Sequence, residues 1–366
     1  MNEANILALL RLLSTPNVGQ TRIRNLVDQF GSPEAVFHAS IGELSSTPQI
    51  SLILAEKILS YQDQKWVDNQ LRFLDNKKIR IMTLWDAEYP DMLRAIYDPP
   101  SVLFIKGELK KEDDLSVGIV GTRRASRYGL KVASKISMEL SERGLTVVSG
   151  LARGIDTAAH KAALDAGGRT IAVLGCGLDV VYPLENHKFY EDIPLHGAII
   201  SEYPMNTHPE PKNFPPRNRI ISGLSQGVLV VEAPIRSGAL LTANSALNQG
   251  REVFAVPGLI TDKRSGGTHN LIKQGAKLVS SVDDILEELR QLPQSITQRK
   301  TMSKKNVPSL NKNEAMIYEK LGIEPKHIDL LSEELGMPPS ELLVSLLQME
   351  LKSAVTQLPG KLFVVD

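Results

Sequence analysis

VGIVGTRR, residues 117–124, opens the stretch that decides the fold of this chain, and VVSG, residues 147–150, closes it. The first run is an apolar strand that ends at Gly121 and passes into a segment with helical periodicity. A strand that stops at a small residue before a helix presents backbone N–H groups and the positive end of the helix dipole, which attract phosphate. Arg123 and Arg124 add guanidiniums, which bind phosphate bidentately. The stretch therefore predicts a site for a nucleotide or a nucleic-acid backbone.

The same alternation of strands and helices continues from Leu115 to about Leu289. The predicted strands are residues 117–120, 146–148, 170–174, 198–200, 228–231 and 253–256, and segments such as 130–140 and 239–247 have helical periodicity. Continuous apolar strands that alternate with helices predict an α/β fold, in which helices cover both faces of a parallel sheet. Because ligands bind such sheets at the carboxyl ends of the strands, the residues after each strand are the candidate site.

Small residues and arginines follow the predicted strands, and a basic run farther along surrounds one aromatic ring, Phe214. Cations that flank a ring suit single-stranded nucleic acid, whose bases stack and whose phosphates pair with Arg or Lys. The predicted phosphate- and DNA-binding residues are Gly121, Thr122, Arg123, Arg124, Ser149, Gly150, Arg153, Lys212, Phe214, Arg217, Arg219, Ser237 and Gly238.

The composition limits the class of protein. At 366 residues the chain is too long for one ordinary core, so we expect two or three domains. Lys plus Arg and Asp plus Glu balance at 42 each, so nucleic-acid binding must depend on a local basic patch. No apolar run approaches the ~18 residues of a membrane helix. With no signal-like N-terminus and only one cysteine, Cys176, we expect a cytoplasmic protein without membrane contact.

The segments on either side of the sheet region differ from it. Residues before Lys110 read as mostly helical, and a glycine turn at residues 17–20 separates two short helices there. Such a hairpin can bind a phosphate through its turn amides, but a bundle built only for packing has the same pattern. We predict a small helical domain, SAM-like or helix-hairpin-helix-like, over residues 1–84, and the sheet domain over residues 85–290.

The C-terminal region begins with a basic segment, residues 291–310, which we predict to be a flexible linker. Residues 311–366 then read as three helices, 314–321, 328–335 and 339–349, followed by a hairpin over 354–365. This order predicts a winged-helix-like domain. The third helix has no Lys or Arg before Lys352, which favours a protein contact over the reading of a DNA groove.

Several long motifs in this order resemble the DNA-processing protein A family, DprA or Smf. They are GTRR at 121–124, SGLARGID at 149–156, FPPRNRIISGLS at 214–225, VEA at 231–233 with SGAL at 237–240, and VFAVPG at 253–258. The resemblance covers residues 85 to 290 closely and the two flanks more loosely.

The resemblance implies an extended Rossmann-like domain that binds single-stranded DNA as a homodimer and loads a RecA-type recombinase onto it, in natural transformation and homologous recombination. It implies no catalytic residue, no metal and no cofactor. Carried over by motif, the DNA site includes Arg123, the Ser149-Gly150 turn and the segment that holds Lys212, Phe214, Arg217 and Arg219. The sequence departs from many relatives at Asn213, so Lys212 is carried over less securely than Arg123.

Some of these residues have other interpretations. The arginines after the first strand could pair with surface carboxylates. Asp156 and His160 could be two metal ligands or an acid–base pair, although helix capping and packing suit them better. Cys176 has no evident base and reads as a small buried residue. Glu202 and Glu232 end strands and could bind a ribose hydroxyl or orient Arg123, and orientation is favoured because unpaired carboxylates repel phosphates.

The alternative function is a Rossmann-like enzyme that binds or hydrolyses nucleotides, similar to the lysine-decarboxylase-like phosphoribohydrolases. The Pro-Gly-Gly-x-Gly-Thr-x-x-Glu signature of that family is absent from the sequence. The loop where it would fall reads APIRSGA, residues 233–239.

Overall fold

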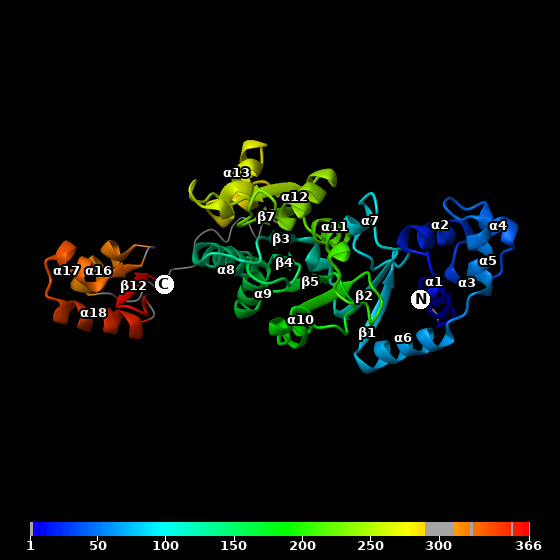
Figure 1. Cartoon of the computed structure of the whole chain (residues 1–366), viewed down its shortest axis with the longest axis horizontal. Helices are drawn as coiled ribbons and strands as arrows, with labels where there is room; N and C mark the ends of the chain where they lie inside the picture. Colours follow the sequence, from blue (N-terminus) through cyan, green and yellow to red (C-terminus); the bar gives the residue numbers. More distant parts are fainter. Residues whose placement is uncertain (1–2, 290–310, 323–324, 353, 366) are drawn as a thin grey trace. The chain divides into compact units, whose positions relative to one another are not determined.

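A computed structural model describes residues 3–289, 311–322, 325–352 and 354–365 (Figure 1). The chain forms two compact units, residues 1–297 and 298–366. None of the described helices is long and apolar enough to cross a membrane.

The larger unit is built on a nine-stranded sheet in the order β1-β2-β6-β5-β4-β3-β7-β8-β9. The seven strands from β6 to β9 in this order pair in parallel, and β1 and β2 add an antiparallel pair at one edge. The strands are β1 (Ile79–Thr83), β2 (Val102–Gly107), β3 (Ser116–Val120), β4 (Thr146–Ser149), β5 (Thr170–Leu174), β6 (Gly197–Ser201), β7 (Gly227–Val230), β8 (Glu252–Ala255) and β9 (Lys277–Leu278). The six predicted strands and the α/β fold class are thereby confirmed.

Helices cover both faces of the sheet because its strands are apolar on both sides. In β5, Ile171 and Val173 pack into one core, whereas Ala172 and Leu174 pack into the other. The helices on the first face are α7 (Asp91–Arg94), α11 (Phe214–Leu224), α12 (Gly238–Asn248) and α13 (Gly266–Lys273). Those on the second face are α8 (Arg127–Glu142), α9 (Ile155–Asp165), α10 (Phe189–His196) and α14 (Val282–Leu286). Short 3-10 helices are η1 (Lys111–Asp114), η2 (Leu184–Asn186), η3 (Pro211–Asn213) and η4 (Lys263–Ser265).

The prediction that residues before Lys110 are mostly helical is wrong for β1 and β2. β2 pairs antiparallel with β6, and Phe104 lies opposite Ser201. The helix between β1 and β2, α7, has only four residues, and both strands pair antiparallel, so the alternation of parallel strands with long helices that revealed the other strands does not extend to this edge. The apolar run VLFIKG, residues 102–107, was the available signal.

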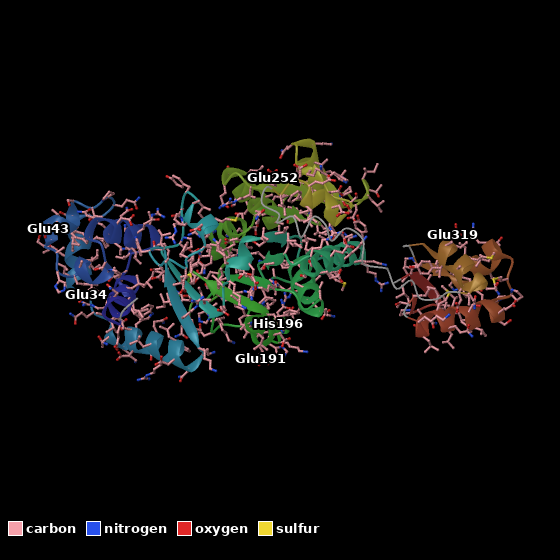
Figure 2. All side chains as sticks on the ribbon, turned by 180° about the vertical axis from the view of Figure 1, so that it is seen from behind. Glu34, Glu43, Glu191, His196, Glu252 and Glu319 are labelled. Carbon is pink, nitrogen blue, oxygen red and sulfur yellow. The ribbon has the colours of Figure 1, made fainter. Side chains whose placement is uncertain are left out.

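Six helices precede the sheet and pack on its β2 and β6 side. They are α1 (Glu3–Ser14), α2 (Gln20–Phe30), α3 (Pro33–Val36), α4 (Ile41–Ser45), α5 (Leu52–Ser60) and α6 (Gln64–Asn76). Leu9 and Ile23 share a core with Phe104 and Ile199 of the sheet. The helices α1 and α2 confirm the predicted pair. Acidic side chains such as Glu34, Glu43 and Glu191 lie exposed on the surface of this unit (Figure 2).

The chain changes direction across the sheet at β3. From β3 it adds β4, β5 and β6 on one side, and then α11 carries it back to place β7 on the other side of β3. A crevice forms at the carboxyl ends of the strands where the order reverses in this way. The fold therefore places the turn after β3 opposite the turn after β7.

The C-terminal unit has the predicted three helices and hairpin. It comprises α16 (Lys312–Leu321), β10 (Lys326–His327), α17 (Ile328–Leu335), α18 (Pro339–Leu351), β11 (Val355–Leu358) and β12 (Leu362–Val365). Its strands form a three-stranded sheet in the order β10-β12-β11 around a small core that includes Leu331, Leu346 and Phe363. Lys352 pairs with the buried Glu314 at 2.7 Å. The predicted linker, residues 291–310, lies outside the described residues, and the bounds of the four predicted segments stay predictions.

Candidate nucleic-acid interface

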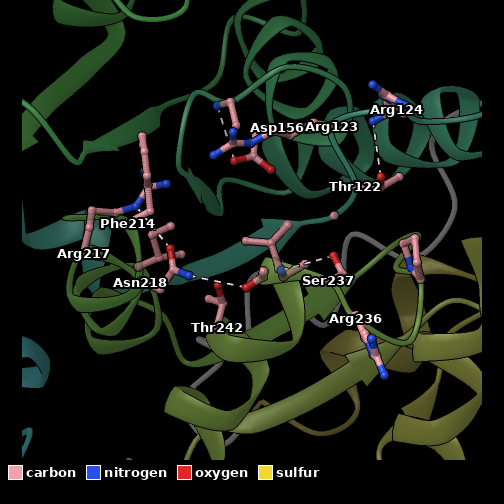
Figure 3. A pocket seen from close by; sticks show the side chains of 17 residues that line it. Thr122, Arg123, Arg124, Asp156, Phe214, Arg217, Asn218, Arg236, Ser237 and Thr242 are labelled. Atoms are coloured by element: carbon pink, nitrogen blue, oxygen red, sulfur yellow. Dashed lines mark hydrogen bonds between the residues drawn. The ribbon is translucent and has the colours of Figure 1, made fainter. Parts of the chain in front are cut away.

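A pocket of about 410 Å³ lies at the switch point, at the carboxyl ends of β3 and β7 (Figure 3). Its walls are the turn after β3, the start of α9, one side of α11, and the turn after β7 with the start of α12. The lining residues are Val120, Gly121, Thr122, Arg123, Arg124, Ala152, Asp156, Phe214, Arg217, Asn218, Ile221, Pro234, Arg236, Ser237, Gly238, Ala239 and Thr242. The structure thus brings together most of the residues that the sequence predicted for a DNA site.

Glu232 holds the turn that carries Arg123 and Arg124. The N–H of Thr122 donates to the Glu232 carbonyl at 2.7 Å, and the Glu232 carboxylate accepts from the N–H (2.9 Å) and hydroxyl of Ser126. Ser126 in turn caps α8, since its Oγ accepts from the Gly129 N–H at 2.9 Å. The carboxylate therefore fixes the start of α8, and the expectation that it orients Arg123 is wrong.

Phe214 lies between two guanidiniums. The Cζ atom of Arg123 is 5.1 Å from the centroid of the ring, and the Cζ of Arg217 is 5.9 Å from it. Both distances are within the range of a cation–π contact. Phe214 is the first residue of α11 and is only half-buried, so part of the ring stays accessible beside Arg123.

Arg217 supports this arrangement from the interior of the protein, where it is only 4% exposed. Its guanidinium donates to the carbonyls of Gly150 (2.8 Å) and Val173, and burial lowers the pKa of Arg217. Gly150 must be small, because a Cβ there would lie 2.5 Å from Nη1 of Arg217. Gly150 thus serves the pocket through its carbonyl and its missing side chain.

Asp156 places a buried carboxyl in the pocket wall. Its Oδ2 accepts from the backbone N–H groups of Gly150 at 3.2 Å and Ala152 at 3.4 Å. Burial raises the pKa of Asp156 to about 6, against the opposing effect of the cations of Arg217 and Arg123. His160 has a different partner, Thr170 Oγ1, 2.7 Å from its Nδ1, and burial lowers its pKa to about 3. Their separate partners agree with the predicted packing role, but α9 begins after Gly154 without a side-chain cap, so the predicted helix-capping role is wrong.

Three arginines of the pocket keep their charge available. Within the described part of the chain, no carboxylate lies within ion-pair distance of Arg123, Arg124 or Arg236, and all three are exposed. The alternative interpretation, in which the arginines after β3 pair with surface carboxylates, is therefore wrong among the described residues. The N-terminus of α12 adds to the cationic side of the pocket. Ser237 caps this helix, and the first N–H groups of the helix have no partner within it.

Besides Gly150, four predicted residues do not line the pocket. Ser149 is buried and donates its hydroxyl to the Ile119 carbonyl at 2.6 Å. Lys212 is exposed and pairs with Glu210 at 2.7 Å. Arg153 is exposed and pairs with Glu185. The fourth residue, Arg219, belongs to a separate polar cluster, and a DNA contact of these residues stays a prediction.

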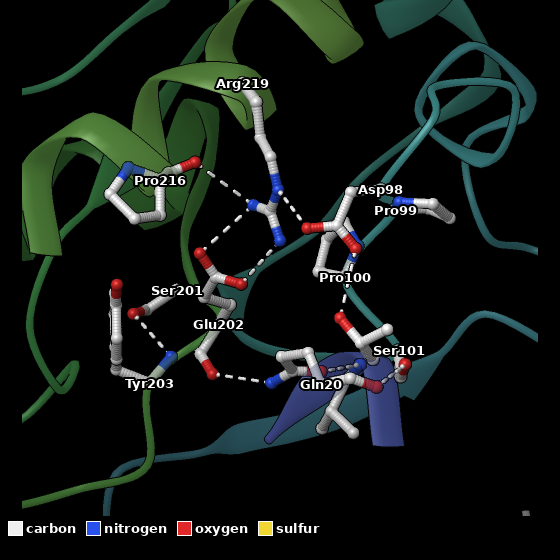
Figure 4. Close-up of polar contacts among 12 residues, drawn as sticks. Gln20, Asp98, Pro99, Pro100, Ser101, Ser201, Glu202, Tyr203, Pro216 and Arg219 are labelled. Atoms are coloured by element: carbon white, nitrogen blue, oxygen red, sulfur yellow. Dashed lines mark hydrogen bonds and ion pairs between the residues drawn. The ribbon is translucent and has the colours of Figure 1, made fainter. Parts of the chain in front are cut away.

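That cluster joins α11 to the N-terminal helices (Figure 4). Arg219 Nη2 lies 2.8 Å from Glu202 Oε2, and its Nε lies 3.3 Å from Asp98 Oδ2. Asp98 also pairs with Arg24 of α2 at 3.2 Å. The side chain of Gln20 bridges the Glu202 carbonyl and the Val102 N–H, at 3.0 Å each. Glu202 therefore holds Arg219, and the expectation that it orients Arg123 is wrong as well.

Sequence reasoning missed four polar lining residues: Asp156, which it assigned to capping and packing, and Asn218, Arg236 and Thr242. Arg236 lies in the turn after β7, so the rule that selected Ser237 and Gly238 would also have found it. Asn218 is one helical turn from Phe214 on α11, and its amide donates to the Gly238 carbonyl at 3.5 Å. Thr242 is four residues after Gly238 on α12, so helical spacing was the signal for both side chains.

The described residues give little support to a metal site or to a nucleophilic thiol. They contain no group of three or more His, Cys, Asp and Glu side chains that could hold a metal ion. Cys176 is buried, as predicted, and burial raises the pKa of its thiol to about 11. A thiol with that pKa is protonated at neutral pH and is a poor nucleophile.

Comparison with known protein families matches both units. The family DNA recombination-mediator protein A matches residues 80–290, and the DprA winged helix domain matches residues 303–361. Protein Smf of Escherichia coli is 40% identical over 316 residues, which cover 85% of this chain and 84% of that protein. DNA processing protein DprA of Streptococcus pneumoniae is 48% identical over 212 residues, which cover 58% of this chain and 75% of that protein.

Two solved structures are similar to this chain. The X-ray structure of DNA processing protein A from Streptococcus pneumoniae has a TM-score of 0.70 at 37% identity, covering 78% of this chain and 99% of that one. A structure of DNA processing protein A from Helicobacter pylori, described for its single-stranded DNA binding mode, has a TM-score of 0.52 at 32% identity. It covers 57% of this chain and 94% of that one.

Proposed function

The chain belongs to the DNA recombination-mediator protein A family, and on that premise we propose that it binds single-stranded DNA in the pocket between β3 and β7. Phosphates would pair with Arg123, Arg124 and Arg236, and a base would stack beside Phe214. Such contacts are largely independent of sequence, since every base has a π-face and every nucleotide a phosphate.

One observation carries the proposal: the exposed guanidinium of Arg123, which has no carboxylate partner among the described residues, lies 5.1 Å from a half-buried aromatic ring. A phosphate needs the cation and a base needs the ring, so adjacent parts of one nucleotide find both partners here. The single-stranded DNA binding of the Helicobacter pylori relative supports the same ligand.

We further propose that the bound strand is passed to a RecA-type recombinase in natural transformation and homologous recombination, by a homodimer in the cytoplasm and without catalytic turnover. The relatives named DNA processing protein DprA support this DNA-processing role. The predicted contacts of Ser149, Gly150, Arg153, Lys212, Arg217 and Arg219 belong to the same proposal. Among them Gly150 and Arg217 act by shaping the pocket.

The test is a titration of a fluorescent single-stranded oligonucleotide across a salt series, with a matched duplex as competitor. We expect the single strand to bind more tightly, with an affinity that falls by about 0.7 log units per log unit of salt for each neutralised phosphate. Recombinase assembly on that strand, with and without the protein, then tests the loading step.

The control is Arg143→Ala, which removes an arginine that caps the far end of α8 and pairs with Asp283 at 2.8 Å. It should bind like the wild type. If neither single-stranded nor duplex DNA binds, the proposal fails. Binding or hydrolysis of a free nucleoside monophosphate by the same preparation would then favour the nucleotide enzyme.

A further inference from the structure

A second, much smaller recess adjoins the pocket. It has a volume of about 20 Å³ and is lined by Arg123, Ala152, Arg153, Tyr182 and Pro183. Arg123 and Ala152 also line the larger pocket, so the two hollows share a wall. A strand that leaves the pocket past Arg123 therefore meets this recess next. Its size does not admit a whole base, but its rim carries a ring and a guanidinium.

The ring is that of Tyr182, and it is fixed beside Phe214. The two ring centroids are 5.9 Å apart, with the planes inclined by 37°. The backbone N–H of Tyr182 donates to the hydroxyl of the buried Tyr190 at 3.1 Å, and that hydroxyl donates to the Val180 carbonyl at 3.1 Å. Tyr182 is only half-buried. It is therefore a second aromatic surface, held in place by the core and next to the first.

The guanidinium is that of Arg153, and in the free protein it is occupied by Glu185. Nε and Nη2 of Arg153 donate to the two carboxylate oxygens, the second at 3.1 Å. These hydrogen bonds lower the pKa of Glu185 and keep it ionised. The side chains are 60% and 51% exposed, and exposed ion pairs are weak. Because a phosphate offers a guanidinium the same two-oxygen contact as a carboxylate, it can take the place of Glu185.

We propose that this recess is the subsite for the nucleotide next to the one in the pocket. The base stacks on Tyr182, and the phosphate binds Arg153 in place of Glu185, so that Glu185 competes with DNA for this arginine. The inference rests on the proposed function, since it extends the same single-stranded DNA site. It adds Tyr182 as a second stacking residue and Glu185 as a residue that limits affinity.

The first experiment is a double-mutant cycle on Glu185 and Arg153, measured with a labelled single strand of about 20 nucleotides. Glu185→Gln should bind about two- to five-fold more tightly than the wild type, because it releases Arg153. Arg153→Ala should bind more weakly, and adding Glu185→Gln to it should gain little. Asp283→Asn removes a charge from an exposed pair elsewhere and should not change the affinity.

An equal gain from Glu185→Gln with and without Arg153 would overturn the competition, because it would reflect net charge alone. No gain in either background would overturn it too. Weak binding by the wild type itself is a different result, since it would contradict the proposed function. The two failures are therefore distinguishable in one series of titrations.

The second experiment tests the ring. Tyr182→Ala should weaken binding of the long strand about five- to hundred-fold, and Tyr182→Phe should recover most of that loss, because stacking needs only the ring. With 2-aminopurine in the strand, stacking quenches its fluorescence, and Tyr182→Ala should reduce the quenching. If Tyr182→Ala stays folded by circular dichroism and binds and quenches like the wild type, the subsite is not there.

Discussion

Two clusters of arginines lie around α11, and they differ in their partners. In the pocket, Arg123 has a ring beside it and no carboxylate within ion-pair distance among the described residues. On another side of the helix, Arg219 is held by Glu202 and Asp98. Both arginines come from motifs that resemble the same DNA-binding family. The comparison shows that arginines from motifs of one family differ in whether a buried carboxylate already holds the guanidinium.

The two environments also differ in burial. The side chains of Arg219 and Glu202 are 15% and 5% exposed, whereas Arg123 lies on the surface. A buried pair has already lost its water, so removing one partner leaves a charge that neither solvent nor protein stabilises. Breaking the Arg219 cluster should therefore destabilise the fold, whereas we propose that the pocket binds DNA, and four expectations follow.

The largest effect should come from Glu202→Ala, which leaves Arg219 with the partly exposed Asp98 and the Pro216 carbonyl as partners. We expect it to lower the free energy of unfolding by about 3–5 kcal/mol, as for other broken buried pairs. Urea denaturation followed by circular dichroism measures the loss. Asp283→Ala breaks the exposed pair with Arg143 and should cost less than about 1 kcal/mol. Equal losses for the two variants would show that burial does not distinguish them.

The next effect concerns the ring of the pocket. Phe214→Ala should weaken single-stranded DNA binding by about 1–3 kcal/mol, because a stacked base loses its platform. Tyr97→Ala is the matched control, since Tyr97 is fully exposed and is not among the pocket-lining residues. Fluorescence anisotropy gives both affinities. If Phe214→Leu keeps the wild-type affinity while folded, an apolar surface suffices and the ring does not stack.

The salt dependence of binding separates the two arginine clusters most directly. Arg123→Ala should weaken binding to all sequences alike and reduce the slope of log K against log salt by about 0.7, the contribution of one phosphate. Arg219→Gln tests the predicted contact of the paired arginine in the same titration. A slope reduced as much by Arg219→Gln as by Arg123→Ala would place Arg219 in the interface despite its carboxylates.

The smallest effect should be a pH dependence that comes from Asp156. Burial raises the pKa of Asp156 to about 6, although the nearby cations of Arg217 and Arg123 oppose this shift. A bound phosphate would raise the pKa further, because its negative charge disfavours the carboxylate. Binding then takes up protons, so affinity should increase as pH falls from 7 to 5, about five-fold if the pKa rises by one unit. Asp156→Asn should bind with little pH dependence. A wild-type affinity that is flat over this range would exclude a phosphate near Asp156.

Much of the fold could be predicted because its signals are local. The strand at residues 170–174 has the bounds that its apolar run indicated, and the helices of the C-terminal unit follow their periodicity and glycine stops. The antiparallel strands β1 and β2 could not be placed in this way. Their position depends on the pairing of Phe104 with Ser201, which lie far apart in the sequence.

The candidate site also combines features that could be predicted from the sequence with features that could not. The sequence by itself determined the parallel sheet, the family, and the residues that follow β3 and β7, because strand ends and motifs are contiguous in the chain. Only the tertiary structure decided which cations are available. Arg219 meets Asp98, 121 residues away, and Arg217 meets the carbonyl of Gly150, 67 residues away. The availability of a guanidinium depends on the groups that folding brings to it, and such partners have no fixed spacing in a sequence.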